Sequence, residues 1–225
     1  MHSNYRYEIK FILDESKLAD AIQWLNNSTT ALRSYKNRKV NSIYFDDLIF
    51  SSVKDNLSGI PIRKKLRLRW YSNQENKYPK FEIKIKNGRL GKKITFPIMS
   101  IDENIMELDL ETITSRCIDG LNANNIFFDN HILPSIQIDY EREYFKTSDD
   151  IRITIDHNIQ FYDTQINTSL NKLTPYSYSG HVMEIKFAPE MKNQVAKLIK
   201  PLNISPKRHS KYLIGLAKLG YAVYI

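Results

Sequence analysis

Charged and apolar residues alternate along several segments of this chain, and that alternation constrains its fold more than any other feature. Residues two apart share one face of an extended strand, because successive side chains point to opposite sides. In residues 62–71, IRKKLRLRWY, four basic side chains therefore share a face: Arg63, Lys65, Arg67 and Arg69. One such strand is typical of a half-exposed sheet, but four like charges about 7 Å apart favour an anion opposite them.

Three further segments repeat this pattern and add acidic residues to the basic face. The residues that share a face are Arg6, Glu8 and Lys10, then Glu82, Lys84 and Lys86, and then Glu184 and Lys186. The combination suits phosphoryl transfer, in which cations neutralise phosphate oxygens while a few carboxylates hold Mg²⁺ or Mn²⁺. The alternative is that each glutamate forms an ion pair with the lysine two residues later.

Strand patterns dominate the chain and, together with a few helical segments, predict an α+β fold. β-branched and aromatic residues alternate with polar ones in eight segments: residues 5–12, 40–46, 63–71, 79–87, 92–98, 135–145, 151–156 and 181–187. About eight antiparallel strands are enough to close a barrel. The chain shows no linker rich in Gly, Ser or Pro and no internal repeat, so residues 1–225 are expected to form one domain.

Helical periodicity appears in four places. The first helix is predicted to begin at Asp14, the second at a capping box of Ser100 and Glu103, the third to span 191–199, and the fourth to end at Gly220. If these helices cover the apolar faces of the strands, the charged faces point into the barrel. An inward basic lining is stable only when water or a polyanion compensates it, so the sequence predicts a wet tunnel.

The overall charge agrees with a polyanionic partner but does not identify it. The 33 Lys and Arg against 25 Asp and Glu give a net charge of +8, which suits nucleic acid, anionic lipid or a phosphate chain. Cys117 is the only cysteine, which favours a reducing, cytoplasmic setting. No apolar stretch is long enough for a membrane span. The histidines lack zinc-like spacing, although His209 lies next to two site candidates.

Eight short motifs resemble the catalytic, polyphosphate polymerase domain of the vacuolar transporter chaperone (VTC) complex, within the triphosphate tunnel metalloenzyme (CYTH-like) superfamily. They are RYEIKF (6–11), VNSIYFDD (40–47), KLRLRWY (65–71), FEIKIK (81–86), YEREYF (140–145), RITID (152–156), MEIKF (183–187) and HSKYLIG (209–215). The resemblance runs through nearly the whole chain. It implies an antiparallel barrel tunnel of about eight strands, flanked by helices, whose interior holds a phosphate chain.

The resemblance also implies roles for individual residues. The predicted catalytic residues are Lys10, Arg67, Arg69, Lys84, Arg142, Arg152 and Lys211. Further phosphate-binding residues are expected to be Arg6, Arg63, Lys65, Lys86, Lys93, Lys186 and Ser210. Glu184 matches the metal-binding glutamate, and Glu8 and Glu82 are further candidate ligands for Mn²⁺ or Mg²⁺. The superfamily pattern is Glu-x-Glu-x-Lys, and here Arg6 replaces its first glutamate, before Glu8 and Lys10. The resemblance therefore favours the polymerase branch.

The resemblance implies a metal-dependent phosphotransferase that moves the γ-phosphoryl group of ATP or another triphosphate to a growing polyphosphate chain. Hydrolysis of tripolyphosphate or of a triphosphate ester, and binding of polyphosphate without chemistry, are alternatives. No specific nucleic acid is expected as a partner, because aromatic residues are not concentrated on the basic faces. Work at a membrane would need a membrane-anchored partner protein.

Overall fold

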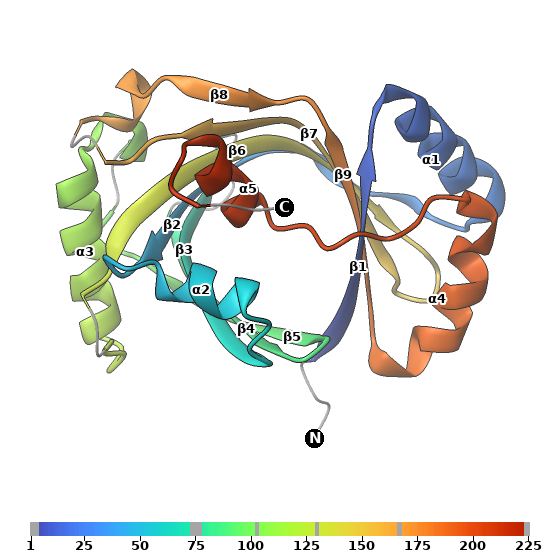
Figure 1. Cartoon of the computed structure of the whole chain (residues 1–225), viewed down its shortest axis with the longest axis horizontal. Coiled ribbons are helices and arrows are strands. Elements are labelled where there is room, and N and C mark those ends of the chain that lie inside the picture. The colour runs from blue at the N-terminus through green and yellow to red at the C-terminus, as the bar shows by residue number, and fades with distance from the viewer. Residues whose placement is uncertain (1–4, 73–77, 102–103, 129–130, 166–167, 223–225) are drawn as a thin grey trace.

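A closed ring of antiparallel strands forms the centre of the molecule (Figure 1). The computed structural model describes residues 5–72, 78–101, 104–128, 131–165 and 168–222. The strands are β1 (Arg6–Leu13), β2 (Leu32–Asp46), β3 (Ile62–Tyr71), β4 (Lys80–Asn87), β5 (Leu90–Pro97), β6 (Leu133–Lys146), β7 (Arg152–Tyr162), β8 (Pro175–Tyr178) and β9 (His181–Phe187). Their order is β6-β2-β3-β4-β5-β1-β9-β7-β8, and β7 pairs again with β6, which closes the barrel.

The nine strands occupy eight positions in the ring, because β8 and β9 run along β7 as one interrupted strand. Tyr178 lies opposite Ile159, and Val182 lies opposite Asp156. Between these two pairs, residues 157–158 of β7 face three residues of the other strand, which is the pattern of a β-bulge. The predicted barrel and its eight strand segments are therefore confirmed. The short β8 was not predicted, and β2 begins earlier than predicted, at residue 32.

Three helices cover the outside of the barrel: α1 (Glu15–Ser28), α3 (Leu110–Asn122) and α4 (Lys192–Ile199) (Figure 1). The first begins as predicted, since Asp14 accepts a hydrogen bond from the backbone of Lys17. Phe11 and Ile185 pack in a core with α1 and α4, while Phe81 packs in a second core with α3. Because side chains alternate along a strand, the charged neighbours of these apolar residues face the interior.

The predicted start of the second helix is wrong. Helix α3 begins at Leu110, and Asp109 caps it by accepting a 2.8 Å hydrogen bond from the backbone of Thr112. Ser100 instead donates to the carbonyl of Arg116 at 3.2 Å, and Glu103 lies outside the described residues. Apolar residues before Asp109, such as Ile101, are buried beside α3 without belonging to it. Their spacing therefore resembles that of a helix although it arises from burial of the preceding segment.

A short helix, α2 (Ser51–Leu57), was not predicted. Two aspartates hold its first turn: Asp46 accepts from the backbone of Ser52 at 3.1 Å, and Asp47 accepts from the backbone of Ser51 at 2.9 Å. Seven residues are too few for a clear helical period in sequence, so only these capping residues signal the helix. No helix in the described residues is both long and apolar enough to cross a membrane.

The last predicted helix, α5 (Lys211–Lys218), packs against the inside of the barrel, not the outside as expected (Figure 1). Its residue Leu213 shares a core with Val182, which lies on the same strand face as the interior residue Glu184. Gly215 permits the close approach, because a Cβ atom there would lie 2.7 Å from the ring of Phe161. The helix therefore fills part of the interior and brings its first residues to the charged surface.

Candidate functional site in the barrel interior

The strand register sets acidic residues directly opposite basic ones on the inner surface of the barrel. Four such pairs occur: Lys10 with Glu184, Glu8 with Lys186, Arg67 with Glu82, and Arg142 with Asp156. Directly opposite residues of antiparallel strands are near enough for their side chains to interact. The interior charges are therefore organised around four carboxylates.

The first carboxylate, Glu82 of β4, is surrounded by three cations. Its Oε2 lies 2.5 Å from Arg67 Nη2 and 3.8 Å from Arg69 Nη1, and its Oε1 lies 2.5 Å from Lys93 Nζ. Burial alone would raise the pKa of Glu82, but Arg67, Arg69 and Lys93 together hold that pKa below its ordinary value. Both oxygens are bound by cations, so Glu82 is the least suitable of the three candidate metal ligands.

A second cluster contains Glu8 of β1 and Glu184 of β9, which interact electrostatically. Lys84 Nζ donates to both oxygens of Glu8, at 2.9 and 2.7 Å. Burial opposes ionisation of Glu8, but the charge of Lys84 and other cations lowers its pKa to about 2. Glu184 Oε1 is buried and lies 3.4 Å from Lys186 Nζ, yet it accepts no hydrogen bond from the described residues. Burial opposes ionisation of Glu184, but Lys186 and other cations hold its pKa below its ordinary value, so Glu184 is a buried and incompletely satisfied carboxylate.

A divalent cation fits this second cluster. A buried carboxylate oxygen without a hydrogen bond is an available ligand, and Mg²⁺ or Mn²⁺ takes oxygen ligands. Such ions are commonly held by one or two carboxylates together with substrate phosphates. In the described part of the chain, no group of three His, Cys, Asp or Glu residues is placed to hold a metal ion. A metal at Glu184 and Glu8 would therefore take its other ligands from phosphate or water.

The fourth carboxylate, Asp156 of β7, was not selected from the sequence. It is fully buried and accepts from Arg142 Nε and Nη2 at 2.6 and 2.8 Å, and from Lys211 Nζ at 2.5 Å. The ring of Tyr140 lies against both cations, with its centroid 5.0 Å from Arg142 Cζ and 4.7 Å from Lys211 Nζ. Asp156 therefore fixes two predicted catalytic residues. The sequence did contain a signal for Asp156, because this residue shares a strand face with the predicted site residue Arg152 in the motif RITID.

A row of three lysines crosses neighbouring strands of the barrel. Lys65 of β3 lies opposite Lys84 of β4, which lies opposite Lys93 of β5. Lys65 Nζ donates to Ser210 Oγ at 2.8 Å, where Ser210 also caps α5. Burial, together with the charge of Lys10 and of Lys84, lowers the pKa of Lys65 well below its ordinary value. The row therefore contains repulsion that a bound anion would relieve.

The interior carries more positive than negative charge. Ten basic side chains are Lys10, Lys65, Arg67, Arg69, Lys84, Lys86, Lys93, Arg142, Lys186 and Lys211, and the four carboxylates are Glu8, Glu82, Asp156 and Glu184. Even with Asp46, a further buried carboxylate that accepts a hydrogen bond from Tyr212 of α5, the basic side chains outnumber the acidic ones. Confined charges of one sign are costly unless they are compensated, so this surface is suited to a polyanion.

Removing one member of the lysine row should raise the stability of the ligand-free protein and lower its affinity for the ligand. Lys65→Met is expected to raise the free energy of unfolding of the ligand-free protein by about 1 kcal/mol, because it removes a buried amino group from among like charges. The same change should weaken tripolyphosphate binding about tenfold, the effect of one lost charge-assisted hydrogen bond. Urea unfolding and calorimetric titration measure the two effects. Lys64→Met changes an exposed side chain on the outer face of the same strand; it is the control and should change neither.

The interior carboxylates also set how stability depends on pH. The folded-state pKa values of Glu8 and Asp156 lie below their ordinary values of 4.5 and 3.8. Groups with lowered pKa contribute stability that is fully present above the unfolded-state pKa and is lost as the pH falls through the folded-state pKa. The free energy of unfolding should therefore fall steadily below about pH 4.5. Urea unfolding at pH 3.5 and pH 6 tests this, and equal stability at both would contradict it.

Three predicted site residues lie at or near the ends of strands and make no ion pair with the four interior carboxylates in the described structure. Arg6 is the exposed first residue of β1, and Arg63, near the start of β3, donates to the carbonyl of Ile60 at 2.7 Å. Arg152 begins β7, and its half-exposed side chain lies 3.6 Å from Asp150 Oδ1. Their phosphate-binding roles stay predictions.

His209, noted in the sequence beside Ser210, is buried near the charged cluster. Its carbonyl accepts from Lys10 Nζ at 3.0 Å, and neither ring nitrogen has a hydrogen-bond partner among the described residues. Burial, Lys211 and Lys10 lower the pKa of His209 to about 3, so the ring is neutral at neutral pH. Nothing in the amino-acid sequence distinguishes this buried environment from an exposed one.

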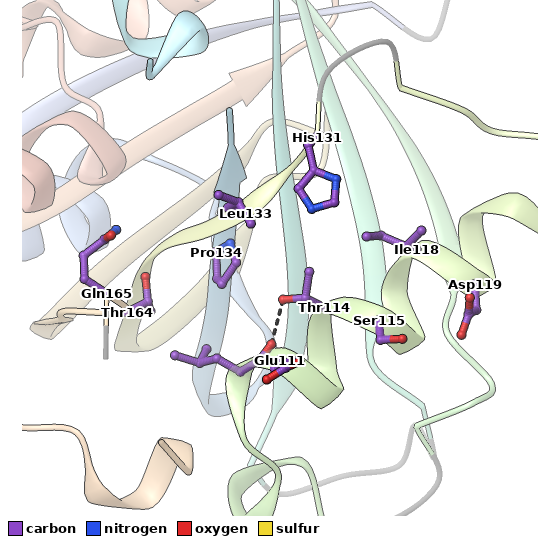
Figure 2. A pocket seen from close by; sticks show the side chains of 11 residues that line it. Glu111, Thr114, Ser115, Ile118, Asp119, His131, Leu133, Pro134, Thr164 and Gln165 are labelled. Atoms are coloured by element: carbon purple, nitrogen blue, oxygen red, sulfur yellow. Dashed lines mark hydrogen bonds between the residues drawn. The ribbon is translucent and has the colours of Figure 1, made fainter. Parts of the chain in front are cut away.

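A separate pocket of about 460 Å³ lies outside the barrel, between α3 and the start of β6 (Figure 2). Its lining includes apolar residues such as Ile118 and Pro134 and the acidic residues Glu111 and Asp119. Among the described residues that line it there is no lysine or arginine. The pocket is therefore chemically unlike the charged interior and unsuited to a phosphate chain.

The closed antiparallel barrel with its charged inner surface has the triphosphate-tunnel fold. Three examples from the solved structures that share this fold follow. One is a putative adenylate cyclase from Vibrio parahaemolyticus, with a TM-score of 0.53 and 12% identity, covering 96% of this chain and 99% of that chain. Another is a protein from Pyrococcus horikoshii OT3, with a TM-score of 0.52 and 11% identity, covering 95% and 99%. The third is a putative adenylyl cyclase from Hippeastrum described as having a dominant triphosphatase activity, with a TM-score of 0.51 and 11% identity, covering 98% of both chains.

The chain belongs to the VTC domain family, which matches residues 5–220. The match includes every motif on which the resemblance in the sequence rests. No curated protein matches the sequence. The distant structures show the barrel fold, and the family match shows the family.

Proposed function

We propose that this protein is a polyphosphate polymerase-like enzyme that binds ATP or another triphosphate, and a polyphosphate chain, inside the barrel. It transfers the γ-phosphoryl group to the chain. The observation that supports this proposal is the excess of basic over acidic side chains on the inner surface of a VTC-family barrel. Fixed cations on neighbouring strands neutralise phosphate oxygens and stabilise the charge that develops during transfer.

The proposed roles follow from where the side chains lie. Six of the predicted catalytic residues belong to the interior clusters and would bind and orient the phosphates: Lys10, Arg67, Arg69, Lys84, Arg142 and Lys211. Arg152, with Arg6 and Arg63, would contact the chain at the barrel ends. Lys65, Lys86, Lys93, Lys186 and Ser210 would add further phosphate contacts. Mn²⁺ or Mg²⁺ held by Glu184 and Glu8 would supply further positive charge at the phosphate oxygens.

The partners in this proposal are the nucleotide and inorganic polyphosphate. A cytoplasmic setting fits a chain whose one cysteine, Cys117, is free and buried. Any work at a membrane would be directed by a membrane-anchored partner protein. Single-stranded DNA should compete poorly for bound tripolyphosphate at physiological salt, because the proposal requires no base stacking.

Product analysis tests the proposal directly. Purified protein incubated with ATP and Mn²⁺ should form long polyphosphate, with or without a short polyphosphate primer. Gel electrophoresis of the product measures chain length, and enzymatic detection of ADP measures turnover. Absence of both polyphosphate and ADP under primed and unprimed conditions would contradict the proposed polymerase.

Hydrolysis of tripolyphosphate or of a triphosphate ester is the second candidate. It is favoured by the same barrel fold in the Hippeastrum protein, which is described as having a dominant triphosphatase activity. The interior charges would act on a triphosphate in the same way, but water would accept the phosphoryl group. Release of orthophosphate without a polymeric product, in the same assay, would select hydrolysis.

A further inference from the structure

Two histidines that are far apart in sequence meet on the outside of the barrel. His157 in β7 and His181 at the start of β9 face each other, with their Nδ1 atoms 3.2 Å apart. His181 lies on the same strand face as Met183 and Ile185, which belong to the outer core beneath α1. The pair is therefore separate from the charged interior, whose side chains point the opposite way.

A carboxylate holds the other nitrogen of each imidazole. Nε2 of His157 lies 2.8 Å from Glu143 Oε1, and Nε2 of His181 lies 3.0 Å from Glu15 Oε1. Arg33 donates to the second oxygen of Glu143 at 2.6 Å and keeps that carboxylate in place. An ionised carboxylate only accepts hydrogen bonds, so each Nε2 is the N–H donor.

This arrangement directs two lone pairs at each other. A neutral imidazole that carries its proton on Nε2 has its lone pair on Nδ1. Each neutral ring has one N–H group, and both N–H groups donate hydrogen bonds to the carboxylates of Glu15 and Glu143. The 3.2 Å contact between the Nδ1 atoms of His157 and His181 therefore lacks a donor, and it becomes favourable when both nitrogens bind one cation.

The geometry matches the way histidines bind a transition metal. A metal-bound histidine commonly donates its other ring N–H to a carboxylate, as both rings do here. Two Zn–N bonds of about 2.0–2.1 Å at a tetrahedral angle place the nitrogens about 3.3 Å apart, close to the spacing of His157 and His181. The two side chains are 18% and 13% exposed, so solvent reaches the site.

We propose that His157 and His181 bind a late divalent transition ion such as Zn²⁺ through their Nδ1 atoms and thereby link β7 to β9. Imidazole nitrogen suits Zn²⁺, Ni²⁺ and Cu²⁺, whereas Mg²⁺ prefers oxygen, so this site and the interior carboxylates select different metals. Among the described residues no third His, Cys, Asp or Glu completes a metal-binding group with them. Water therefore occupies the remaining coordination positions.

Zinc titration of the metal-free protein at pH 7.5 tests the proposal. Calorimetry should detect a site whose affinity falls at least about tenfold in His157→Phe and in His181→Phe, because each change removes one ligand. Zn²⁺ should also raise the melting temperature of the wild type but not of the variants. His131→Phe, an exposed histidine elsewhere, and Glu184→Gln, in the interior, are controls that should keep the site.

Nitrogen-15 spectra of the wild type give a measurement that does not depend on any variant. Zn²⁺ should shift the Nδ1 resonances of His157 and His181 and leave that of His131 unchanged. Equal Zn²⁺ affinity in the wild type and both phenylalanine variants would overturn the proposal. Nδ1 resonances that respond to pH but not to Zn²⁺ would also overturn it, because a shared proton would then be the cation between the rings.

Discussion

Asp156→Asn should lower the free energy of unfolding by about 3 kcal/mol or more, because it removes the negative charge that compensates two buried cations. Arg142 donates two hydrogen bonds to this carboxylate and Lys211 donates a third. The asparagine side chain keeps the shape of the aspartate but not its charge. Urea unfolding of the ligand-free protein measures the loss.

Tripolyphosphate should restore much of this stability, because a bound polyanion supplies the missing negative charge beside Arg142 and Lys211. Its effect on the melting temperature should therefore be larger in Asp156→Asn than in the wild type. Asp150→Asn removes the acid of an exposed pair with Lys146 and is the matched control, with an expected change within about 0.5 kcal/mol. A variant at position 156 as stable as this control would show that Asp156 does not compensate the cations.

Glu184→Gln should lower turnover by a factor of about 100 or more while leaving tripolyphosphate affinity within a few-fold of the wild type. The buried Oε1 of Glu184 accepts no hydrogen bond from the part of the chain that the structure describes, which makes it the best available metal ligand among the interior carboxylates. Affinity depends mainly on the ten basic side chains, and these are retained. Steady-state kinetics with ATP and Mn²⁺, together with calorimetric titration of tripolyphosphate, measure the two quantities.

Glu190 is an exposed residue shortly after β9, the strand that carries Glu184. Glu190→Gln is the matched control and should change neither turnover nor affinity. The Glu184 variant also separates enzyme from binding module. Equal turnover in the wild type and Glu184→Gln would contradict a metal-binding role for this residue. A wild type that binds tripolyphosphate tightly but shows no turnover at all would favour polyphosphate binding without chemistry.

The inner surface could be predicted from the sequence because side-chain alternation in strands is a local property. The parity of residues 62–71 identified the shared basic face, and the same rule applied to Glu8, Glu82 and Glu184. The structure sets all three of these glutamates against cations, but only Glu184 lies near the lysine two residues later, as the ion-pair alternative expected. Glu8 and Glu82 pair with cations of other strands. The three glutamates differ in burial and hydrogen bonding. Of the three, only Glu184 has a buried oxygen without a hydrogen-bond partner among the described residues.

Features that depend on contacts between distant segments could not be predicted. Asp156 becomes important because Lys211 of α5 reaches it across 55 positions of the chain. The inward packing of α5 was missed because an apolar helical stripe does not reveal which side of a barrel it covers. The pairing of His157 with His181 likewise requires two strands to be neighbours, so a search for metal-ligand spacing in sequence does not find it.

A crystal structure of the protein with tripolyphosphate and Mn²⁺ tests the central claim most directly. The account predicts phosphates inside the barrel, in contact with Lys10, Arg67 and Arg142, and a metal ion at Glu184 that shares oxygens with the phosphates. Phosphate bound only on the outer surface, with the basic residues of the interior still paired to Glu8, Glu82 and Asp156, would contradict it.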